Sequence, residues 1–174
     1  MQITGYLTQK KLEDVLKEIS GSGWLGNELH LPNSKRRWDM AFKLDSKTFI
    51  VEYDGDEHYR NTLVIKKDGE KDETARQLGY TVVRIPYWVQ IDSEMLKYYF
   101  GINEKIEQDF PHGFITTRIF PASFCEKGIK RFQNELDKLP NHVKKAVIQS
   151  LKDQTEKHGI EYVLPSSLQS ILKN

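Results

Sequence analysis

Three acidic residues, Asp39, Glu52 and Asp54, lie in or beside a stretch whose pattern predicts two β-strands. Residues 37–44 alternate in polarity, and residues 48–53 are rich in β-branched and aromatic side chains. Side chains on a strand repeat every second residue, so acids at these positions can project from one face of a sheet. Hard carboxylate oxygens that converge in this way are the ligands that Mg²⁺ prefers.

The loop between the two strands decides how closely the acids approach one another. If Asp45-Ser46 is the whole loop, Asp39 lies directly opposite Glu52 on the neighbouring strand. A four-residue loop places Asp39 opposite Asp54 instead, and all three acids share one face in both registers. A three-residue loop breaks this alignment.

Carboxylates held this close repel one another, and the repulsion increases with burial. A divalent cation offsets it, because Mg²⁺ takes one or two carboxylates, keeps several waters and receives phosphate oxygens of a substrate. The alternative is a solvated strand face with ordinary acids on it. Asp and Glu are depleted in strand interiors, which favours the metal site.

Basic side chains flank this acidic face. The cluster Lys35-Arg36-Arg37 could hold a phosphate backbone near the metal, or it could be a solvated strand end. His58, four residues after Asp54, could be a general base, a water-orienting group or an ordinary surface histidine. Farther along the chain, a second basic group could track a phosphate backbone or belong to a solvated helical face; it includes Lys127, Lys130 and Arg131.

Length and composition restrict the class of protein. The chain has 174 residues, enough for one domain with a substantial core or one domain plus a small appendage. Its net charge of +1 gives no whole-chain signal for nucleic acid, so such a function depends on local basic patches. A single cysteine, Cys125, rules out a disulfide framework and a thiolate zinc site, which suits a cytoplasmic protein. No apolar run approaches ~20 residues, so we expect no membrane span.

The remaining pattern predicts an α/β fold, with a mixed sheet flanked by helices and a helical C-terminal region. Strands 48–53 and 80–85, separated by a helix, are expected to be parallel neighbours with a right-handed connection. Thr8 can cap the first helix. The other expected elements are a strand at 28–31, helices at 8–19, 68–78 or 70–78, 92–100 or 93–100, 103–109, 123–139 and 141–157, an extended segment at 114–120 and a final turn at 168–172.

This order of elements and acids resembles the PD-(D/E)xK nuclease superfamily, the fold of many restriction enzymes. Residues 38–58, followed by Lys71-Asp72 and residues 78–85, are similar to the branch related to the very-short-patch repair endonucleases. That branch typically shows D…(I/V)E-x-DG-x-x-H…RD…L-G-(Y/W)-x-V-x-R. The segment Glu13-Asp14-Val15-Leu16 resembles its helical E-x-x-L element, in which the Glu helps to organise the site.

The chain departs from this family pattern in two respects. The usual lysine of the superfamily falls at Asp54, although the E-x-D form is common in the resembling branch. The work of that lysine, orienting the attacking water and balancing charge, therefore goes to His58 or to Lys71, and the sequence does not choose between them. The zinc ligands of the mismatch-repair members also have no counterpart, because one cysteine cannot supply them.

The resemblance implies metal-dependent hydrolysis of DNA by a restriction-endonuclease-like core over residues 1–100 with a helical extension over 101–174. Restriction enzymes and nucleases of mobile elements are the types of enzyme that this suggests. Asp39 and Glu52 would bind Mg²⁺, or Mn²⁺ as a substitute, with Asp54 as a further ligand or an outer carboxylate and the backbone carbonyl of Tyr53 completing the set. Two alternatives stay open: a catalytically inactive DNA-binding module of the same fold, and a partner-binding protein whose acids bind a stray cation. The recognised bases, nicking or double-strand cutting, and assembly as a homodimer or larger oligomer are also open.

Overall fold

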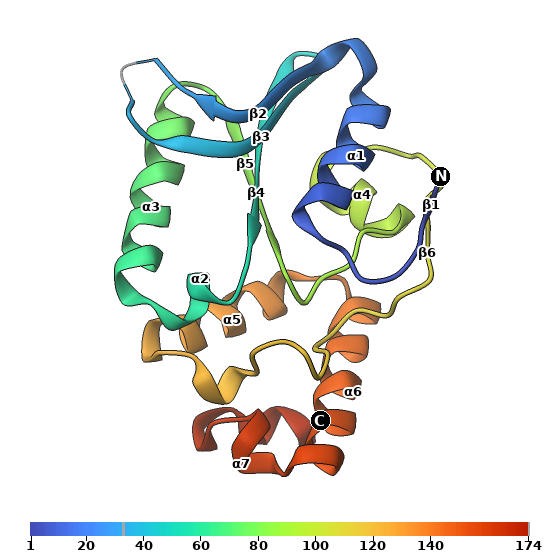
Figure 1. The fold of residues 1–174 in the computed structure, drawn as a ribbon, viewed down its shortest axis with the longest axis vertical. Helices are drawn as coiled ribbons and strands as arrows, with labels where there is room; N and C mark the ends of the chain where they lie inside the picture. Colours follow the sequence, from blue (N-terminus) through green and yellow to red (C-terminus); the bar gives the residue numbers. More distant parts are fainter. Residues whose placement is uncertain (33, 174) are drawn as a thin grey trace.

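The chain forms a mixed four-stranded sheet with helices on both faces and a helical C-terminal region (Figure 1). The computed structural model describes residues 1–32 and 34–173. Strands lie in the order β2 (Trp24–His30), β3 (Arg37–Leu44), β4 (Lys47–Asp54) and β5 (Thr81–Pro86). The predicted α/β class with a mixed sheet is confirmed, and the strand expected at 28–31 begins earlier, at Trp24.

The β3–β4 hairpin has the two-residue loop that places its acids opposite each other. Leu44 pairs with Lys47 and Met40 with Val51, so Asp45 and Ser46 form the whole connection. Asp45 adopts a positive φ of 51°, a conformation that Asp tolerates better than most residues in tight turns. The four-residue and three-residue alternatives are thereby excluded.

Strands β4 and β5 are parallel and are connected through α2 (Glu57–Arg60) and α3 (Thr62–Gln77). This confirms the expected strand–helix–strand unit. The start predicted for its helix, at residue 68 or 70, is wrong, because the helix begins at Thr62. The Asn61 side chain caps it there by accepting hydrogen bonds from the backbone N–H groups of Leu63 and Val64.

Helices cover the two faces of the sheet differently. On one side, α1 (Gln9–Ser20) and α4 (Ser93–Phe100) pack over the larger apolar core, and α3 lies on the other side (Figure 1). Thr8 caps α1 as predicted, its hydroxyl accepting a hydrogen bond from the Lys11 N–H. A short 3-10 turn, Gly21–Gly23, connects α1 to β2.

Two elements after α4 differ from the prediction. The helix expected at 103–109 is wrong, because this segment is extended and its strand β6 (Glu107–Gln108) pairs in parallel with β1 (Gln2–Ile3). The segment 114–120 forms no strand and contains a turn in which the Arg118 N–H donates to the Ile115 carbonyl. Tertiary pairing with the N-terminal segment outweighs the local helical pattern of 103–109.

The C-terminal region consists of α5 (Glu126–Lys138), α6 (Asn141–His158) and α7 (Ile160–Val163), with 3-10 segments at Pro121–Ser123 and Ser166–Lys173. As predicted, Pro140 separates the two long helices. One apolar cluster joins residues of this region to residues of the sheet and α1, so the two parts share a core. Within the described residues, no helix is long and apolar enough to cross a membrane.

Candidate functional site

Asp39 and Glu52 meet where the paired backbones of β3 and β4 separate. The ladder between these strands ends at the Met40–Val51 pair, and carboxylates take over its hydrogen bonds beyond that point. Glu52 Oε1 accepts from the Asp39 backbone N–H at 3.1 Å, and Asp39 Oδ2 accepts from the Tyr53 N–H at 2.9 Å. Both side chains therefore occupy the fork between the strands, as the two-residue loop predicted.

The two carboxylates lie in an unfavourable environment for negative charge. Burial raises the pKa of Asp39, and the nearby Asp54 charge adds to this effect against the opposing hydrogen bond from the Tyr53 N–H and the Lys71 charge. Burial also raises the pKa of Glu52, which is only 2% exposed, and the Asp39 charge raises it further. The fork thus favours any added positive charge, whether a proton or a metal ion.

Lys71 is the basic residue that hydrogen-bonds to this acid pair, whereas Arg84 Nη2 lies farther away, 3.9 Å from Glu52 Oε2. Lys71 lies on α3, and its Nζ is 2.7 Å from Glu52 Oε2. The ammonium group also lies 5.5 Å from the centre of the Trp38 ring, an arrangement in which the aromatic face attracts the cation. Of the two candidate water-orienting groups, His58 and Lys71, Lys71 is therefore the one bonded to Glu52.

Asp54 is fully buried, and both its oxygens accept from arginines. Arg84 Nη1 donates to Asp54 Oδ1 at 2.7 Å, and Arg131 Nη2 donates to Asp54 Oδ2. His58 Nδ1 also lies 3.2 Å from Asp54 Oδ1. These contacts place Asp54 in a network of buried charges next to the fork, with its oxygens already engaged.

His58, on α2, belongs to the same network. Its Nδ1 lies 2.7 Å from Asp68 Oδ2 on α3, so the neutral ring that donates there has Nε2 as its free acceptor. Burial opposes the charged ring, but the Asp68 hydrogen bond and the Asp54 and Asp68 charges raise the pKa of His58 above its ordinary value. The same hydrogen bond, with help from Arg84, outweighs burial and lowers the pKa of Asp68.

Sequence reasoning assigned no site role to several residues of this network, although Asp72 and Arg84 fall within the matched motifs. Arg84 Nε donates to Asp72 at 2.9 Å, and Arg84 Nη2 lies 3.4 Å from Asp68. Two signals could have found them: Asp68 and Asp72 are four residues apart and so share a helix face, and an arginine within a buried strand requires acidic partners. Glu135 gave no comparable signal. It accepts from Arg131 Nε on the same helix at 2.8 Å and from the Tyr59 hydroxyl at 2.5 Å, and both contacts depend on the fold.

The predicted basic cluster before β3 borders the fork. Arg36 pairs with Glu70 at 2.5 Å and Arg37 with Glu28 at 3.1 Å, while Lys35 is exposed. A surface hollow of about 340 Å³ opens here, lined by Glu28, Arg36, Arg37, Trp38, Asp39 and Lys71. The structure thus brings two of the three basic residues to the same hollow as Asp39.

The other predicted site residues lie in different surroundings. Glu13, on α1, forms an ion pair with Lys10 at 3.7 Å, and among the described residues it does not bond to the fork. Lys127 and Lys130 are exposed on α5, where Lys130 pairs with Glu126 at 2.7 Å. Arg131 is on the same helix but points inward, with only 13% of its side chain exposed. It belongs to the carboxylate network, so of these three basic residues only the two lysines are exposed on the surface of α5.

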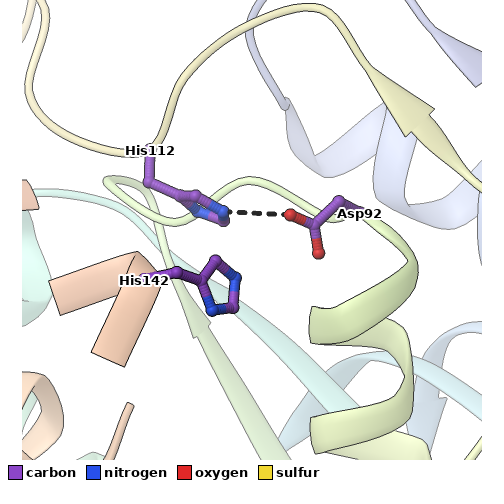
Figure 2. A group of neighbouring side chains, drawn as sticks. All are labelled: Asp92, His112 and His142. Carbon is purple, nitrogen blue, oxygen red and sulfur yellow. Dashed lines mark hydrogen bonds and ion pairs between the residues drawn. The ribbon is translucent and has the colours of Figure 1, made fainter. Parts of the chain in front are cut away.

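A second group of potential metal ligands, Asp92, His112 and His142, lies between α4, the loop before residue 113 and α6 (Figure 2). His112 Nδ1 accepts from the Gln90 backbone N–H at 3.1 Å, so its Nε2 carries the proton and faces Asp92 Oδ2 at 3.3 Å. A metal bound to Nε2 would have to displace that proton and leave the Gln90 N–H without its acceptor. The arrangement therefore fits a hydrogen-bonded helix cap better than a metal centre.

Comparison with known proteins adds no assignment to this geometry. No protein-family model, no curated protein and no solved structure matches the chain. The function is therefore argued from the site itself.

Proposed function

We propose that this protein is a Mg²⁺-dependent endodeoxyribonuclease with a restriction-endonuclease-like core of the PD-(D/E)xK type. One observation carries the proposal: Asp39 and Glu52 meet at the fork between β3 and β4, and Lys71 of α3 reaches Glu52 at 2.7 Å. An acid pair and a lysine are the groups that such hydrolysis needs: ligands for the metal, and a cation for the attacking water. Here the lysine comes from a helix instead of the Glu-x-Lys position.

The residues at the fork fit a divalent metal ion. The raised pKa values of Asp39 and Glu52 mean that a cation between them would relieve an existing electrostatic cost. The connected network also holds more acids than bases, even with His58 charged: Asp39, Glu52, Asp54, Asp68, Asp72 and Glu135 against His58, Lys71, Arg76, Arg84 and Arg131. When bound, Mg²⁺ would supply an acidified water and stabilise charge on the phosphate.

We assign different tasks to the surrounding groups. Asp39 and Glu52 would hold the metal with the Tyr53 carbonyl, and Asp54 would serve as an outer carboxylate, because arginines already occupy its oxygens. The ammonium of Lys71 would orient the attacking water. A bond forms between the water oxygen and phosphorus while the bond from phosphorus to the leaving oxygen breaks. His58 Nε2 is the acceptor we assign to the water's proton, and the leaving oxygen takes a proton from solvent.

DNA is the proposed substrate because the hollow beside Asp39 is rimmed by Arg36 and Arg37. Guanidinium groups match phosphate geometry with two parallel donors, and they position a backbone without reading its bases. The present partners of both arginines, Glu70 and Glu28, are surface acids whose ion pairs with them are weak in water. A phosphate can therefore compete for these side chains at little cost.

The test is cleavage of supercoiled plasmid with Mg²⁺, with Mn²⁺ and with excess EDTA, using the wild-type protein, Asp39→Asn and a matched control, Asp14→Asn. Asp14 is an exposed acid on α1 whose partner is Lys10. We expect metal-dependent nicking or linearisation by the wild type and the control, and cleavage reduced by about a hundredfold or more in Asp39→Asn. Cleavage by Asp39→Asn at close to the wild-type rate, or cleavage in excess EDTA, contradicts the proposal. Salt-dependent DNA binding without cleavage would identify the inactive DNA-binding module instead.

A further inference from the structure

Arg131 connects the C-terminal region to the elements that carry the site. Its guanidinium contacts the end of β4 through Asp54, the start of α2 through the His58 carbonyl at 3.2 Å, and α3 through Asp68 at 2.9 Å. Its Nε donates to Glu135 on its own helix. One side chain from α5 therefore joins three separate elements that meet beside the fork.

The backbone brings α5 close enough for this contact. The Cys125 N–H donates to the Tyr59 carbonyl at 3.1 Å, and Gly128 passes so close that an added Cβ would lie 1.7 Å from the same carbonyl oxygen. Arg131 follows Gly128 by one helical turn, and its guanidinium lies 5.0 Å from the centre of the buried Tyr59 ring. The guanidinium position is thus fixed by backbone contact and by packing on an aromatic face.

The contacts of Arg131 differ from those of a surface arginine that binds phosphate. Its donors are used by acceptors within the protein, and the side chain is 13% exposed. Asp54 and Asp68 would otherwise face Arg84 and His58 alone, leaving buried negative charge incompletely balanced. Arg131 therefore acts on the geometry and charge of the network instead of on a bound strand.

We propose that Arg131 is a positioning residue of the nuclease site, which holds Asp54 and the β4–α2 turn in place and makes the helical region 101–174 part of the catalytic centre. This inference rests on the proposed function. The turn runs from Asp54 to His58, both of which Arg131 contacts, and it directly follows Glu52 and Tyr53 in β4. Loss of Arg131 would displace these groups without removing any group that touches the phosphate.

The kinetic experiment compares wild type, Arg131→Met, Arg131→Lys, Asp54→Asn, the double variant Arg131→Met/Asp54→Asn and a control, Arg60→Met. Arg60 is an arginine of α2 that pairs with Asp56 and Glu57 at the surface. We expect Arg131→Met to lower kcat by about tenfold to a hundredfold with KM within about twofold. Arg131→Lys should recover only part of kcat, because an ammonium cannot bridge acceptors on three elements. Arg60→Met should behave as wild type.

The double variant tests whether Arg131 acts through Asp54. Its loss of kcat should be smaller than the product of the two single losses, since each variant disrupts the same contact. A raised KM with unchanged kcat would mean that Arg131 binds DNA, and unchanged kcat per folded molecule would mean that it only stabilises the fold. Either result overturns the inference. If Arg131→Met does not fold, Arg131→Lys serves as the test, and it should likewise lower kcat with little change in KM.

Thermal unfolding of the same proteins, without DNA or metal, separates this inference from the proposed function. If Arg131 and Asp54 are coupled, the fall in Tm of the double variant will differ from the sum of the two single falls. If the falls in Tm are additive and the wild-type protein cleaves DNA, the positioning role of Arg131 is overturned while the proposed nuclease function stands. A wild-type protein that folds but never cleaves overturns the proposed function, and the positioning role with it.

Discussion

The Lys71 ammonium lies 2.7 Å from the Glu52 carboxylate, although 19 positions separate the two residues in the chain. In the PD-(D/E)xK assignment that we propose, the usual lysine would stand at Asp54, whose oxygens are instead engaged by Arg84 and Arg131. The cation of the fork therefore comes from α3, on the face of the sheet opposite α1. This relationship makes Lys71 the water-orienting group of our proposal and leaves proton transfer to His58.

Replacing Asp39 by Asn should separate activity from stability. We expect cleavage to fall by about a hundredfold or more, because a neutral amide is a poor ligand for Mg²⁺. The Asn side-chain oxygen can still accept from the Tyr53 N–H, so the strand ends should keep their hydrogen bond. Burial raises the pKa of Asp39, so its ionised form costs stability at neutral pH, and Tm of the variant should be equal to or above that of wild type. A lower Tm would show that the carboxylate stabilises the fork.

Metal binding should be measurable without any substrate. At a Mg²⁺ concentration ten times Kd, linkage stabilises the folded state by about 1.4 kcal/mol, which corresponds to roughly 3–6 °C in Tm for a chain of this length. We expect this shift in the wild type and in Asp14→Asn, monitored by circular dichroism with and without EDTA. Asp39→Asn and Glu52→Gln should show no shift. An equal shift in these two variants would place the metal elsewhere.

Replacing Lys71 and replacing His58 should have different effects on stability and on kcat. Lys71→Met leaves Glu52 buried beside Asp39 without its closest cation, so we expect a loss of about 1–3 kcal/mol in stability and about tenfold or more in kcat. Lys71→Arg should restore stability more fully than kcat, because the charge returns with a different shape. His58→Asn should lower kcat without removing any bond to Glu52. Full activity of folded Lys71→Met would exclude it as the water-orienting group.

The Asp92–His112 pair should make the free energy of unfolding depend on pH in the acid range, separately from the carboxylates at the fork. Burial alone would raise the pKa of Asp92, but the His112 hydrogen bond and the Met95 N–H outweigh it and lower the pKa below its ordinary value. The resulting stability is complete above the pKa of Asp92 in the unfolded chain and is lost as pH falls through the folded value. His142, which pairs with Glu94, also faces Asp92 and adds to the attraction.

Asp92→Asn isolates this charge, because Asn is an equally good cap for α4. The wild type should be more stable than the variant by about 1 kcal/mol at pH 6, and this difference should vanish as pH falls below the lowered pKa of Asp92. Urea unfolding at a series of pH values measures it. A difference that persists at the lowest pH would mean that the Asp92 carboxylate contributes through something other than its charge.

Local sequence signals predicted the elements that depend on local chemistry. Alternation and the Asp45-Ser46 turn predicted the hairpin, and the two-residue loop, one of three alternatives, gave the register in which Asp39 meets Glu52. Thr8 marked the start of α1. The Asn61 cap of α3 was an equally local signal, but the charged pattern that follows it obscured the start of the helix.

Features that depend on distant contacts could not be predicted in this way. The segment 103–109 has a composition compatible with a helix, and only its pairing with β1 makes it extended. Arg131 has an ordinary helical neighbourhood of alternating charges, and its contact with Asp54 spans 77 positions of the chain. The meeting of the acids at the fork could therefore be predicted from the sequence, whereas the contacts of the arginines with Asp54 could be seen only in the folded structure.

Gly128→Ala tests whether α5 must lie against α2 for the site to work. Within a helix, Ala is favoured over Gly by about 1 kcal/mol, but here the new Cβ would lie 1.7 Å from the Tyr59 carbonyl oxygen. The clash should dominate, costing about 1–3 kcal/mol and shifting α5 outward together with Arg131. Gly69→Ala on α3 is the matched control, since nothing lies within 4 Å of its added Cβ, and it should gain stability. We expect Gly128→Ala to lose kcat as Arg131→Met does; a variant as stable and active as Gly69→Ala would mean that α5 does not approach Tyr59 this closely.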